Sequence, residues 1–372
     1  MSRASQAYQW RRQVASYFVG VSKPLTTALA SFSLGMAWAE RCRLRSVAEA
    51  LPHLGKPDTV ERRLQRFLAN THLDWQSCCV AWTRWVVDRL DHRGSMVLLV
   101  DETSLRDKMK VMVVAVAYRG RAIPLSWWCY RNDDWPMGQV ELVTTLLGWV
   151  RDALHDSKQP PSDVLVEADR CIGTSPTLLR AIEEMGFYYL MRVQRTVKLR
   201  LETGEEIAFG DTLTKPGKRW SGRVHAFKAH GWLPCWAVSG WGKSHEQPWL
   251  LLTNHPQAGP RWYALRMWEE LSFRDLKSSG WEWKRSRVYK PEHANRLWLL
   301  MTMAYGWVLT VGTQVIQNPK RRKLMCRGKK WRYSVFQLGL RWKTRAMALG
   351  TPMIANLNLI PHFPQRPKCV VH

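Results

Sequence analysis

The stretch MVLLVDET, residues 96–103, decides the predicted fold class of this chain. Its first five residues are apolar without interruption, as in a strand that is buried on both faces of a sheet. The apolar run ends at Asp101-Glu102-Thr103. We therefore predict a buried strand over 96–100 that carries a carboxylate, Asp101, at its carboxyl end.

The residues after this strand alternate between strand and helix patterns. Residues 110–118 and 122–128 are strand-like and flank the turn Arg119-Gly120-Arg121, which predicts a hairpin. The elements expected next are a helix at 139–154, a strand at 164–166, a helix at 176–185 and a strand at 187–193. This order predicts an α/β fold with a mixed sheet, in which the first and fourth strands are parallel, and it resembles the ribonuclease-H-like fold.

A second acidic side chain, Asp169, follows the short predicted strand 164–166. If the two strands lie side by side and parallel, their ends meet and Asp101 converges with Asp169. Two close carboxylates repel each other, and divalent cations such as Mg²⁺ relieve that repulsion. Two ions roughly 3.5–4 Å apart can then promote an in-line displacement at phosphorus. Each aspartate alone is equally compatible with a turn or cap residue, so this interpretation needs a third ligand.

A helix predicted over 263–276 provides that ligand. At about 100° per residue, one face of this helix carries Tyr263, Arg266, Glu270 and Lys277. The opposite side, which can pack on a sheet, carries Leu265, Trp268 and Leu276. Glu269 points away from the polar face, so Glu270 is the better candidate. A surface helix with ion pairs such as Arg266–Glu270 would show the same pattern.

The spacing Tyr263-x2-Arg266-x3-Glu270-x6-Lys277 resembles the Y-R-E-K signature of the insertion-sequence-four family of DDE transposases. That family has its first Asp in an Asp-x-Thr-like strand end, here Asp101, and its second in an Asp-Arg pair, here Asp169-Arg170. The resemblance covers about residues 96–316, including a β-rich insertion between the second Asp and the Glu.

The resemblance implies a DNA transposase with a ribonuclease-H-like catalytic core. Such enzymes cleave a strand at the transposon end and use the freed 3′-hydroxyl to attack target DNA. Asp101, Asp169 and Glu270 would hold two Mg²⁺ or Mn²⁺ ions, while Tyr263, Arg266 and Lys277 would position phosphates of the transposon end. The expected partners are double-stranded DNA, both terminal inverted repeats and target, and a second copy of the chain, because two ends are paired before joining.

The same interpretation divides the chain into five parts. These are a helical, DNA-binding region 1–90, a first core part 91–195, a β-rich insertion 196–255, a second core part 256–316 and a basic C-terminal region 317–372. In the first part, Pro52, Gly55 and Pro57 separate helical patterns at 46–51 and 59–68. The polar side of the second pattern carries Arg62, Arg63 and Arg66. A DNA-binding helix-turn-helix and an ordinary helical hairpin with a basic face both fit this pattern.

The charge balance predicts a polyanionic partner. The chain has 56 Lys and Arg against 30 Asp and Glu, which gives a net charge of +26. Ribosomal RNA or an acidic membrane would attract the same charge. The eight cysteines are scattered without zinc spacing, which favours a reducing compartment and neither a zinc site nor a disulfide framework. Because no signal-peptide pattern begins the chain, we expect a cytoplasmic, nucleoid-associated bacterial protein.

Residues 297–316 are uncharged and as long as a membrane-spanning helix. They contain three Thr, a Gln and two Gly and follow a charged helix, so a buried core helix is favoured and no membrane partner is expected. Trp127, Trp128 and Trp135 follow the predicted hairpin, where a core role is favoured over stacking on a flipped base.

Two other functions fit the same residues. A structure-selective nuclease on this core would cut DNA without joining it, and it would not need to bind specific terminal repeats. A non-catalytic DNA- or RNA-binding protein would explain the charge, but the intact set of three carboxylates disfavours it.

Overall fold

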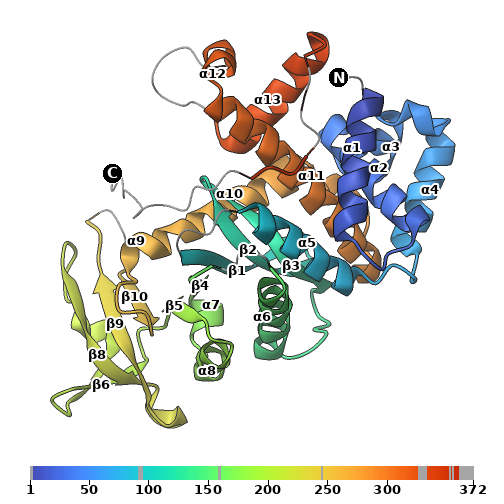
Figure 1. Ribbon diagram of the computed structural model, residues 1–372. Coiled ribbons are helices and arrows are strands. Elements are labelled where there is room, and N and C mark those ends of the chain that lie inside the picture. The colour runs from blue at the N-terminus through green and yellow to red at the C-terminus, as the bar shows by residue number, and fades with distance from the viewer. Residues whose placement is uncertain are drawn as a thin grey trace.

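A single ten-stranded mixed sheet organises the chain (Figure 1). The computed structural model describes residues 3–90, 95–157, 161–243, 246–325, 333–351, 353 and 356–359. The strand order in the sheet is β3-β2-β1-β4-β5-β10-β9-β8-β6-β7. The strands are β1 (Ser95–Leu105), β2 (Met109–Tyr118), β3 (Arg121–Arg131), β4 (Asp163–Ala168), β5 (Tyr188–Arg192), β6 (Lys198–Leu201), β7 (Glu206–Ala208), β8 (Arg219–Ala226), β9 (Leu233–Gly240) and β10 (Trp249–Thr253).

Helices surround the part of the sheet formed by β1–β5. The α-helices are α1 (Arg3–Tyr17), α2 (Lys23–Ala39), α3 (Leu44–Glu49), α4 (Pro57–Ala69), α5 (Trp75–Arg89), α6 (Gln139–His155), α7 (Arg170–Gly173), α8 (Pro176–Glu184), α9 (Pro260–Tyr263), α10 (Met267–Arg274), α11 (Pro291–Gln317), α12 (Pro319–Met325) and α13 (Val335–Ala348). Shorter turns are η1 (Pro52–Leu54), η2 (Phe209–Thr212), η3 (Lys228–His230), η4 (Ala264–Arg266), η5 (Asp275–Ser279) and η6 (Trp283–Arg285). The predicted α/β class and helical N-terminal region are confirmed.

Strand β1 is the centre of the half of the sheet formed by β1–β5. It pairs in parallel with β4 and antiparallel with β2, and β4 pairs in parallel with β5, so the predicted parallel first and fourth strands are confirmed. The prediction that β1 ends at Val100 is wrong. Pairing with β4 stops at Val100, but the hairpin partner β2 keeps β1 extended as far as Leu105. Asp101 therefore lies where the parallel pairing ends, inside a longer strand.

The two faces of β3 are covered by different helices. The Ser126 hydroxyl donates to the carbonyl of Leu146 on α6, while the neighbouring Trp127 indole donates to the carbonyl of Asn295 on α11. Successive residues of a strand point to opposite faces, so α6 and α11 lie on opposite sides of the sheet. Trp127 is buried as predicted, Trp128 is partly buried, and Trp135 is 38% exposed.

The outer edge of β3 is covered by α5. The indole nitrogen of Trp82 donates to the carbonyl of Pro124 at 2.8 Å, and the Thr83 hydroxyl donates to the carbonyl of Leu125 at 3.0 Å. These side chains satisfy strand carbonyls that a further strand would otherwise use.

The strands of residues 196–255 extend the sheet. The predicted runs at 235–238 and 249–252 form parts of β9 and β10. β10 pairs antiparallel with β5 through Thr253–Leu190 and two more residue pairs, so these strands continue the core sheet at its edge. The β-rich region is therefore present, and its strands are hydrogen-bonded to the core.

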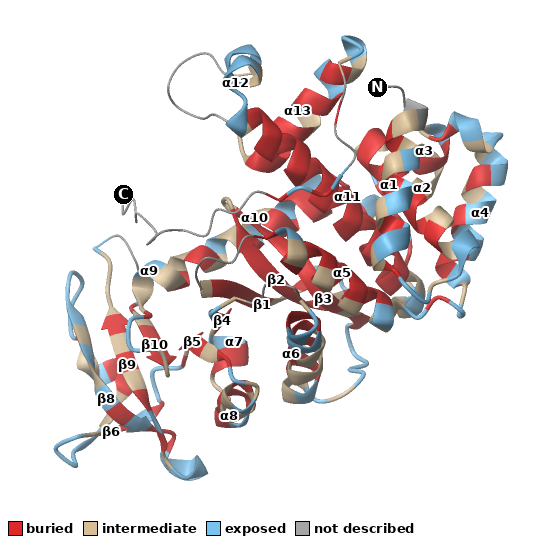
Figure 2. Ribbon diagram, in the orientation of Figure 1, coloured by how far each residue is buried: buried red, intermediate tan, exposed pale blue. Residues whose placement is uncertain are grey.

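The helix α11 runs through the middle of the protein (Figure 2). It is the one helix of the described residues that is long and apolar enough to cross a membrane, and 94% of its most apolar window is buried inside the protein. The predicted buried helix at 297–316 is thereby confirmed. A Cβ atom on Gly312 would lie 1.9 Å from the carbonyl oxygen of Val335, and one on Gly339 of α13 would lie 2.1 Å from that of Val308. The two helices cross in close backbone contact.

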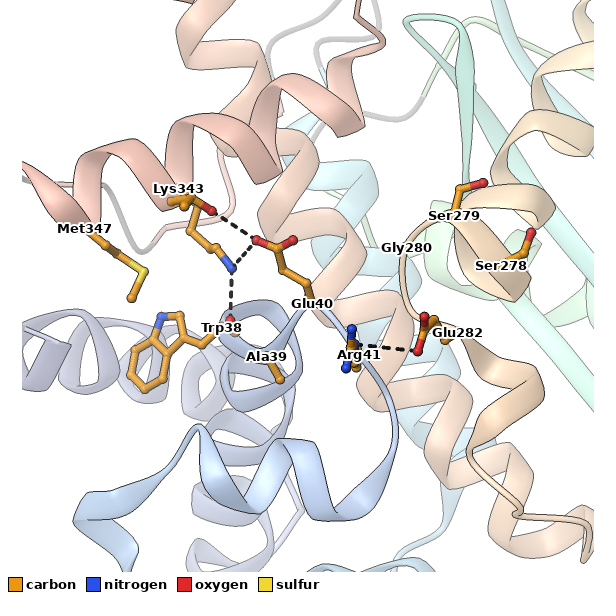
Figure 3. A pocket seen from close by; sticks show the side chains of 11 residues that line it. Trp38, Ala39, Glu40, Arg41, Ser278, Ser279, Gly280, Glu282, Lys343 and Met347 are labelled. Atoms are coloured by element: carbon orange, nitrogen blue, oxygen red, sulfur yellow. Dashed lines mark hydrogen bonds and ion pairs between the residues drawn. The ribbon is translucent and has the colours of Figure 1, made fainter.

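The N-terminal helices are docked on the rest of the chain by polar contacts (Figure 3). Lys343 of α13 donates to the carbonyls of Ala37 and Trp38 and lies 2.7 Å from Glu40. Arg41 pairs with Glu282 at 3.6 Å. Trp38, Glu40, Arg41, Glu282 and Lys343 line a pocket of about 500 Å³ whose lining includes none of the three predicted carboxylate ligands.

The predicted helices on either side of Pro52–Pro57 are present as α3 and α4. Helix α4 buries Val60, Leu64, Phe67 and Leu68, as expected, and exposes Arg62, Arg63 and Arg66. In the basic C-terminal region, Lys320, Arg321, Arg322 and Lys323 belong to α12, whereas Cys326, Lys329, Lys330 and Cys369 lie outside the described residues. The division into five parts stays a prediction.

Candidate active site

Three carboxylates from three separate elements surround one guanidinium group. The Nη2 atom of Arg266 lies 3.1 Å from Oδ2 of Asp101, 4.0 Å from Oδ2 of Asp169 and 3.9 Å from Oε1 of Glu270. The Arg266 side chain is 13% exposed. The structure thus brings Asp101, Asp169, Glu270 and Arg266 together, with the arginine as their shared counter-ion.

Each aspartate is positioned by its backbone surroundings. Oδ1 of Asp101 accepts a hydrogen bond from the Glu102 amide at 2.9 Å, and Oδ1 of Asp169 accepts from the amides of Cys171 and Ile172 as the N-cap of α7. This leaves Oδ2 of both residues facing Arg266. A cap role and a site role are therefore compatible at Asp169, because each uses a different oxygen.

The segment that carries Glu270 is helical but irregular. It passes through α9, the 3₁₀ turn η4, α10 and the π-helical turn η5, so the prediction of one regular helix over 263–276 is wrong in this respect. Asp275, at the start of η5, is buried and accepts hydrogen bonds from Arg121 at 2.5 Å and from Tyr305 at 3.3 Å. These hydrogen bonds hold the chain in the wider π turn, so the residue spacing of a regular α-helix does not apply there.

The other two residues of the predicted polar face lie nearby. Tyr263 is buried and packs edge-to-face on Trp249, with ring centroids 5.3 Å apart. Lys277 lies beyond the start of the π turn, where burial and the charge of Lys284 lower its pKa while Asp101 raises it. Both therefore border the site, although their roles toward DNA stay predictions.

Burial controls the charge of Asp101. Its side chain is 16% exposed, and burial raises its pKa to about 6, with Asp169 and Glu270 raising it further and Arg266 opposing the shift. The carboxylate of Asp101 is thus costly to keep ionised in the absence of a cation.

Two buried acids near the site, Glu167 and Glu269, were not among the predicted site residues. Glu167 and Glu269 are fully buried, and their carboxyl oxygens have no hydrogen-bond partner among the described residues. Burial raises the pKa of both carboxyl groups well above the usual range, and both lie in the field of Arg266. Glu167 could have been found, since it precedes Asp169 by two residues and the extended chain there places both side chains on one face. Glu269 points to the sheet side, away from the polar face, as predicted.

The donor set suits a hard divalent cation, because all three facing groups are carboxylate oxygens. As the side chains stand, however, these oxygens surround a nitrogen of Arg266, and the described residues contain no three acidic, His or Cys side chains already arranged around a common ion position. Asp101, Asp169 and Glu270 therefore fit Mg²⁺ or Mn²⁺ in chemistry, and holding it requires Arg266 to move away.

Binding of Mn²⁺ to the DNA-free chain is expected to weaken about tenfold from about pH 7 to about pH 5. Below the pKa of about 6 the Asp101 carboxyl carries a proton that the ion must displace, so affinity falls as pH falls. Electron paramagnetic resonance of free Mn²⁺ measures this directly. The Asp101→Asn variant should bind more weakly and lose this pH dependence. An identical pH profile in both proteins would contradict the assignment of Asp101 as a ligand.

Comparison with known proteins finds a family that matches part of this chain. Residues 140–307 match the transposase DDE domain family, a range that includes Asp169, Arg266 and Glu270 and begins after Asp101. No curated protein matches the chain. Among solved structures, the C-terminal lobe of a budding yeast Argonaute is similar at 10% identity and a TM-score of 0.21, covering 59% of this chain and 49% of that one, a likeness too low to carry an argument. The match over residues 140–307 supports a DDE transposase.

Proposed function

We propose that this chain is a DNA transposase of the insertion-sequence-four type, which cleaves DNA at transposon ends and joins the freed ends to target DNA. The observation that carries this proposal is the convergence of Asp101, Asp169 and Glu270 on one nitrogen of Arg266. Three acids from separate elements share a single cation there. Such an arrangement suits a site in which metal ions and phosphates are exchanged during a reaction.

Asp101, Asp169 and Glu270 would hold two Mg²⁺ or Mn²⁺ ions, which when bound activate a water or 3′-hydroxyl and stabilise the leaving oxygen. Arg266 would then be released from the carboxylates, and its planar guanidinium would be free to bind a DNA phosphate. Lys277 would add a second positive charge, and the buried Tyr263 would hold the helical segment against the sheet. Burial raises the pKa of Glu167 and Glu269, which favours uncharged carboxyl groups beside the ionised Asp101, Asp169 and Glu270.

The proposal includes the molecular setting. Two copies of the chain would pair two transposon ends before joining, in the bacterial cytoplasm where the DNA lies. The net charge of +26 supports a DNA partner of this kind. A nuclease on the same core is the second candidate, and joining of the cut ends separates the two.

The two neighbouring glutamates provide a matched test. Wild-type protein is expected to cleave and join DNA carrying the element's own terminal repeats with Mg²⁺, and Glu270→Gln to lower joined product about a hundredfold, or about 2.7 kcal/mol. Glu269→Gln should retain activity, since burial raises the pKa of the Glu269 carboxyl, which favours its uncharged form, and glutamine has its shape. Gel assays of cleaved and joined strands measure both.

Three other outcomes have distinct meanings. An equal loss of joined product in both variants would show that Glu270 has no role beyond that of Glu269. Wild-type activity in both variants would contradict the proposed carboxylate site. Cleavage without joining by the wild type would favour the nuclease.

A further inference from the structure

A groove with a basic rim separates α4 from the segment that follows the catalytic helix. Its wide part has a volume of about 910 Å³. Arg62 and Arg66 of α4 line one side, and Arg287, Lys290 and His293 line the other. Apolar side chains, including Leu44, Leu68 and Val288, line the space between them.

The groove continues into a second, narrower part of about 350 Å³. Arg287 and Tyr289 line both parts, which makes them one surface. The narrow part adds Arg43, Arg106, Lys284 and Arg285. Arg287 has a φ of 60°, a backbone conformation that is unfavourable for a residue with a Cβ atom.

Most of the positive charges along the rim form no salt bridge with the described part of the chain. Within the described part of the chain, no carboxylate lines either part of the groove, and Arg62, Arg66 and Arg287 form no salt bridge. Arg285 of the narrow part is an exception, since it binds Glu282 at 3.4 Å, and outside the groove Arg45 binds Glu49 at 2.9 Å. Unpaired cations on both walls of one groove create a strong positive potential, which attracts a polyanion.

Lys284 and Arg106 relate the narrow part of the groove to the carboxylate site. Lys284 lies close enough to Lys277 to lower its pKa, and Lys277 is in turn within the field of Asp101. Arg106 follows β1 five residues after Asp101, which corresponds to roughly 16 Å along an extended strand. That length spans about five nucleotides of a B-form strand at roughly 3.4 Å each.

We propose that this groove binds the sugar–phosphate backbone of duplex DNA next to the strand that enters the carboxylate site, with Arg62, Arg66 and Arg287 as its main phosphate ligands. The apolar lining suits deoxyribose and base edges, and the basic walls suit phosphates on either side. Duplex DNA is favoured over RNA or an acidic peptide because Arg106 of the narrow part lies within roughly 16 Å of Asp101 in the proposed DNA-cleaving site. In that respect the inference rests on the proposed function. Arg62 and Arg66 are thereby assigned as ligands of the DNA backbone, whereas Arg63 is not.

Arg63 provides a matched control on the same helix. It is exposed like Arg62 and Arg66, but it does not line the groove, and its guanidinium donates to the carbonyl of Leu54 at 3.3 Å. Glutamine at any of these positions removes the charge and keeps much of the side-chain length.

The test is a fluorescence-anisotropy titration of a labelled duplex of arbitrary sequence, without divalent cations, over a series of salt concentrations. The variant Arg62→Gln/Arg66→Gln is expected to bind at least about tenfold more weakly, with the slope of log K against log salt reduced by about 2. Arg287→Gln, on the opposite wall, should reduce the slope by about 1, and Arg63→Gln should match the wild type. Thermal melting of each variant checks that it is folded.

Footprinting gives an independent readout. Phosphates protected by the wild type and exposed in Arg287→Gln should begin about five nucleotides from the cleavage position. Wild-type affinity and slope in both groove variants, a loss in Arg63→Gln equal to theirs, or tighter binding of duplex RNA than DNA would each overturn the inference.

The two proposals fail separately. If the wild type cleaves and joins DNA while the groove variants bind duplex like wild type, the groove inference falls and the transposase proposal stands. If the wild type does not cleave DNA but the groove variants lose affinity as expected, the groove inference stands as a duplex-binding surface without the catalytic proposal.

Discussion

Asparagine in place of Asp101 is expected to lower the single-turnover rate of DNA strand cleavage by at least about a thousandfold, or about 4 kcal/mol. Asp101 is the most buried of the three facing carboxylates and makes the shortest contact in the group, 3.1 Å to Arg266. Asparagine keeps the shape but removes the charge that would hold a divalent ion, and a bound ion contributes several kcal/mol to charge stabilisation in the transition state.

The Asp101→Asn variant should fold like the wild type. Because the pKa of Asp101 is raised to about 6 in the folded chain, its ionised form opposes folding at neutral pH when no cation is bound. A neutral asparagine removes that cost, so the metal-free variant should melt at or above the wild-type temperature at neutral pH.

Glu102→Gln is the matched control for Asp101→Asn. Glu102 neighbours Asp101 on β1 but engages Lys110 at 2.8 Å and the Tyr130 hydroxyl, away from Arg266. Glu102→Gln should alter the cleavage rate by less than about threefold, because Glu102 lies outside the site. A similar loss in both variants, or retained cleavage in Asp101→Asn, would contradict the assignment.

Alanine in place of Gly312 is expected to lower the free energy of unfolding by about 3 kcal/mol or more. The new Cβ atom would lie 1.9 Å from the Val335 carbonyl oxygen, which belongs to the backbone and cannot rotate away. Alanine favours a helix over glycine by only about 1 kcal/mol, so the steric cost decides the sign. Gly339→Ala, at 2.1 Å from the Val308 oxygen, should behave in the same way.

Gly148 supplies the control for this prediction. It lies in α6, and a Cβ atom there would meet nothing within 4 Å. Gly148→Ala should therefore stabilise the protein by about 0.5–1 kcal/mol through helix propensity alone. Urea denaturation of the three variants gives the comparison. If Gly312→Ala were as stable as Gly148→Ala, the close helix crossing would be wrong.

The order of strands and helices was predictable because each depends on local sequence periodicity. The apolar run at 96–100 and the acids that follow it indicated a buried parallel strand beside β4, and the adjacent positions of Asp101 and Asp169 follow from that pairing. The extent of β1 was not predictable in this way. Residues 101–105 are held in the strand by β2, a tertiary partner that residue periodicity does not describe.

The three facing acids of the site were predictable from the sequence, but the irregular helical segment that carries Glu270 was not. Spacing along a regular helix placed Arg266 beside Glu270, and those two residues are neighbours. The π turn at Asp275 depends on Arg121, which is 154 residues away, so no local pattern indicates it. The same holds for Glu269, whose burial is decided by the sheet beneath it.

The covering of β3 by α5 has a consequence for self-association. Sheets join other chains through unpaired edge strands, and this sheet has two ends. At one end Trp82 and Thr83 already occupy carbonyls of β3, and Pro124 has no amide hydrogen to donate. At the other end β7 is three residues long, which leaves little to pair with. If two copies of this protein pair as proposed, we therefore expect them to meet through helices and loops, without a shared sheet.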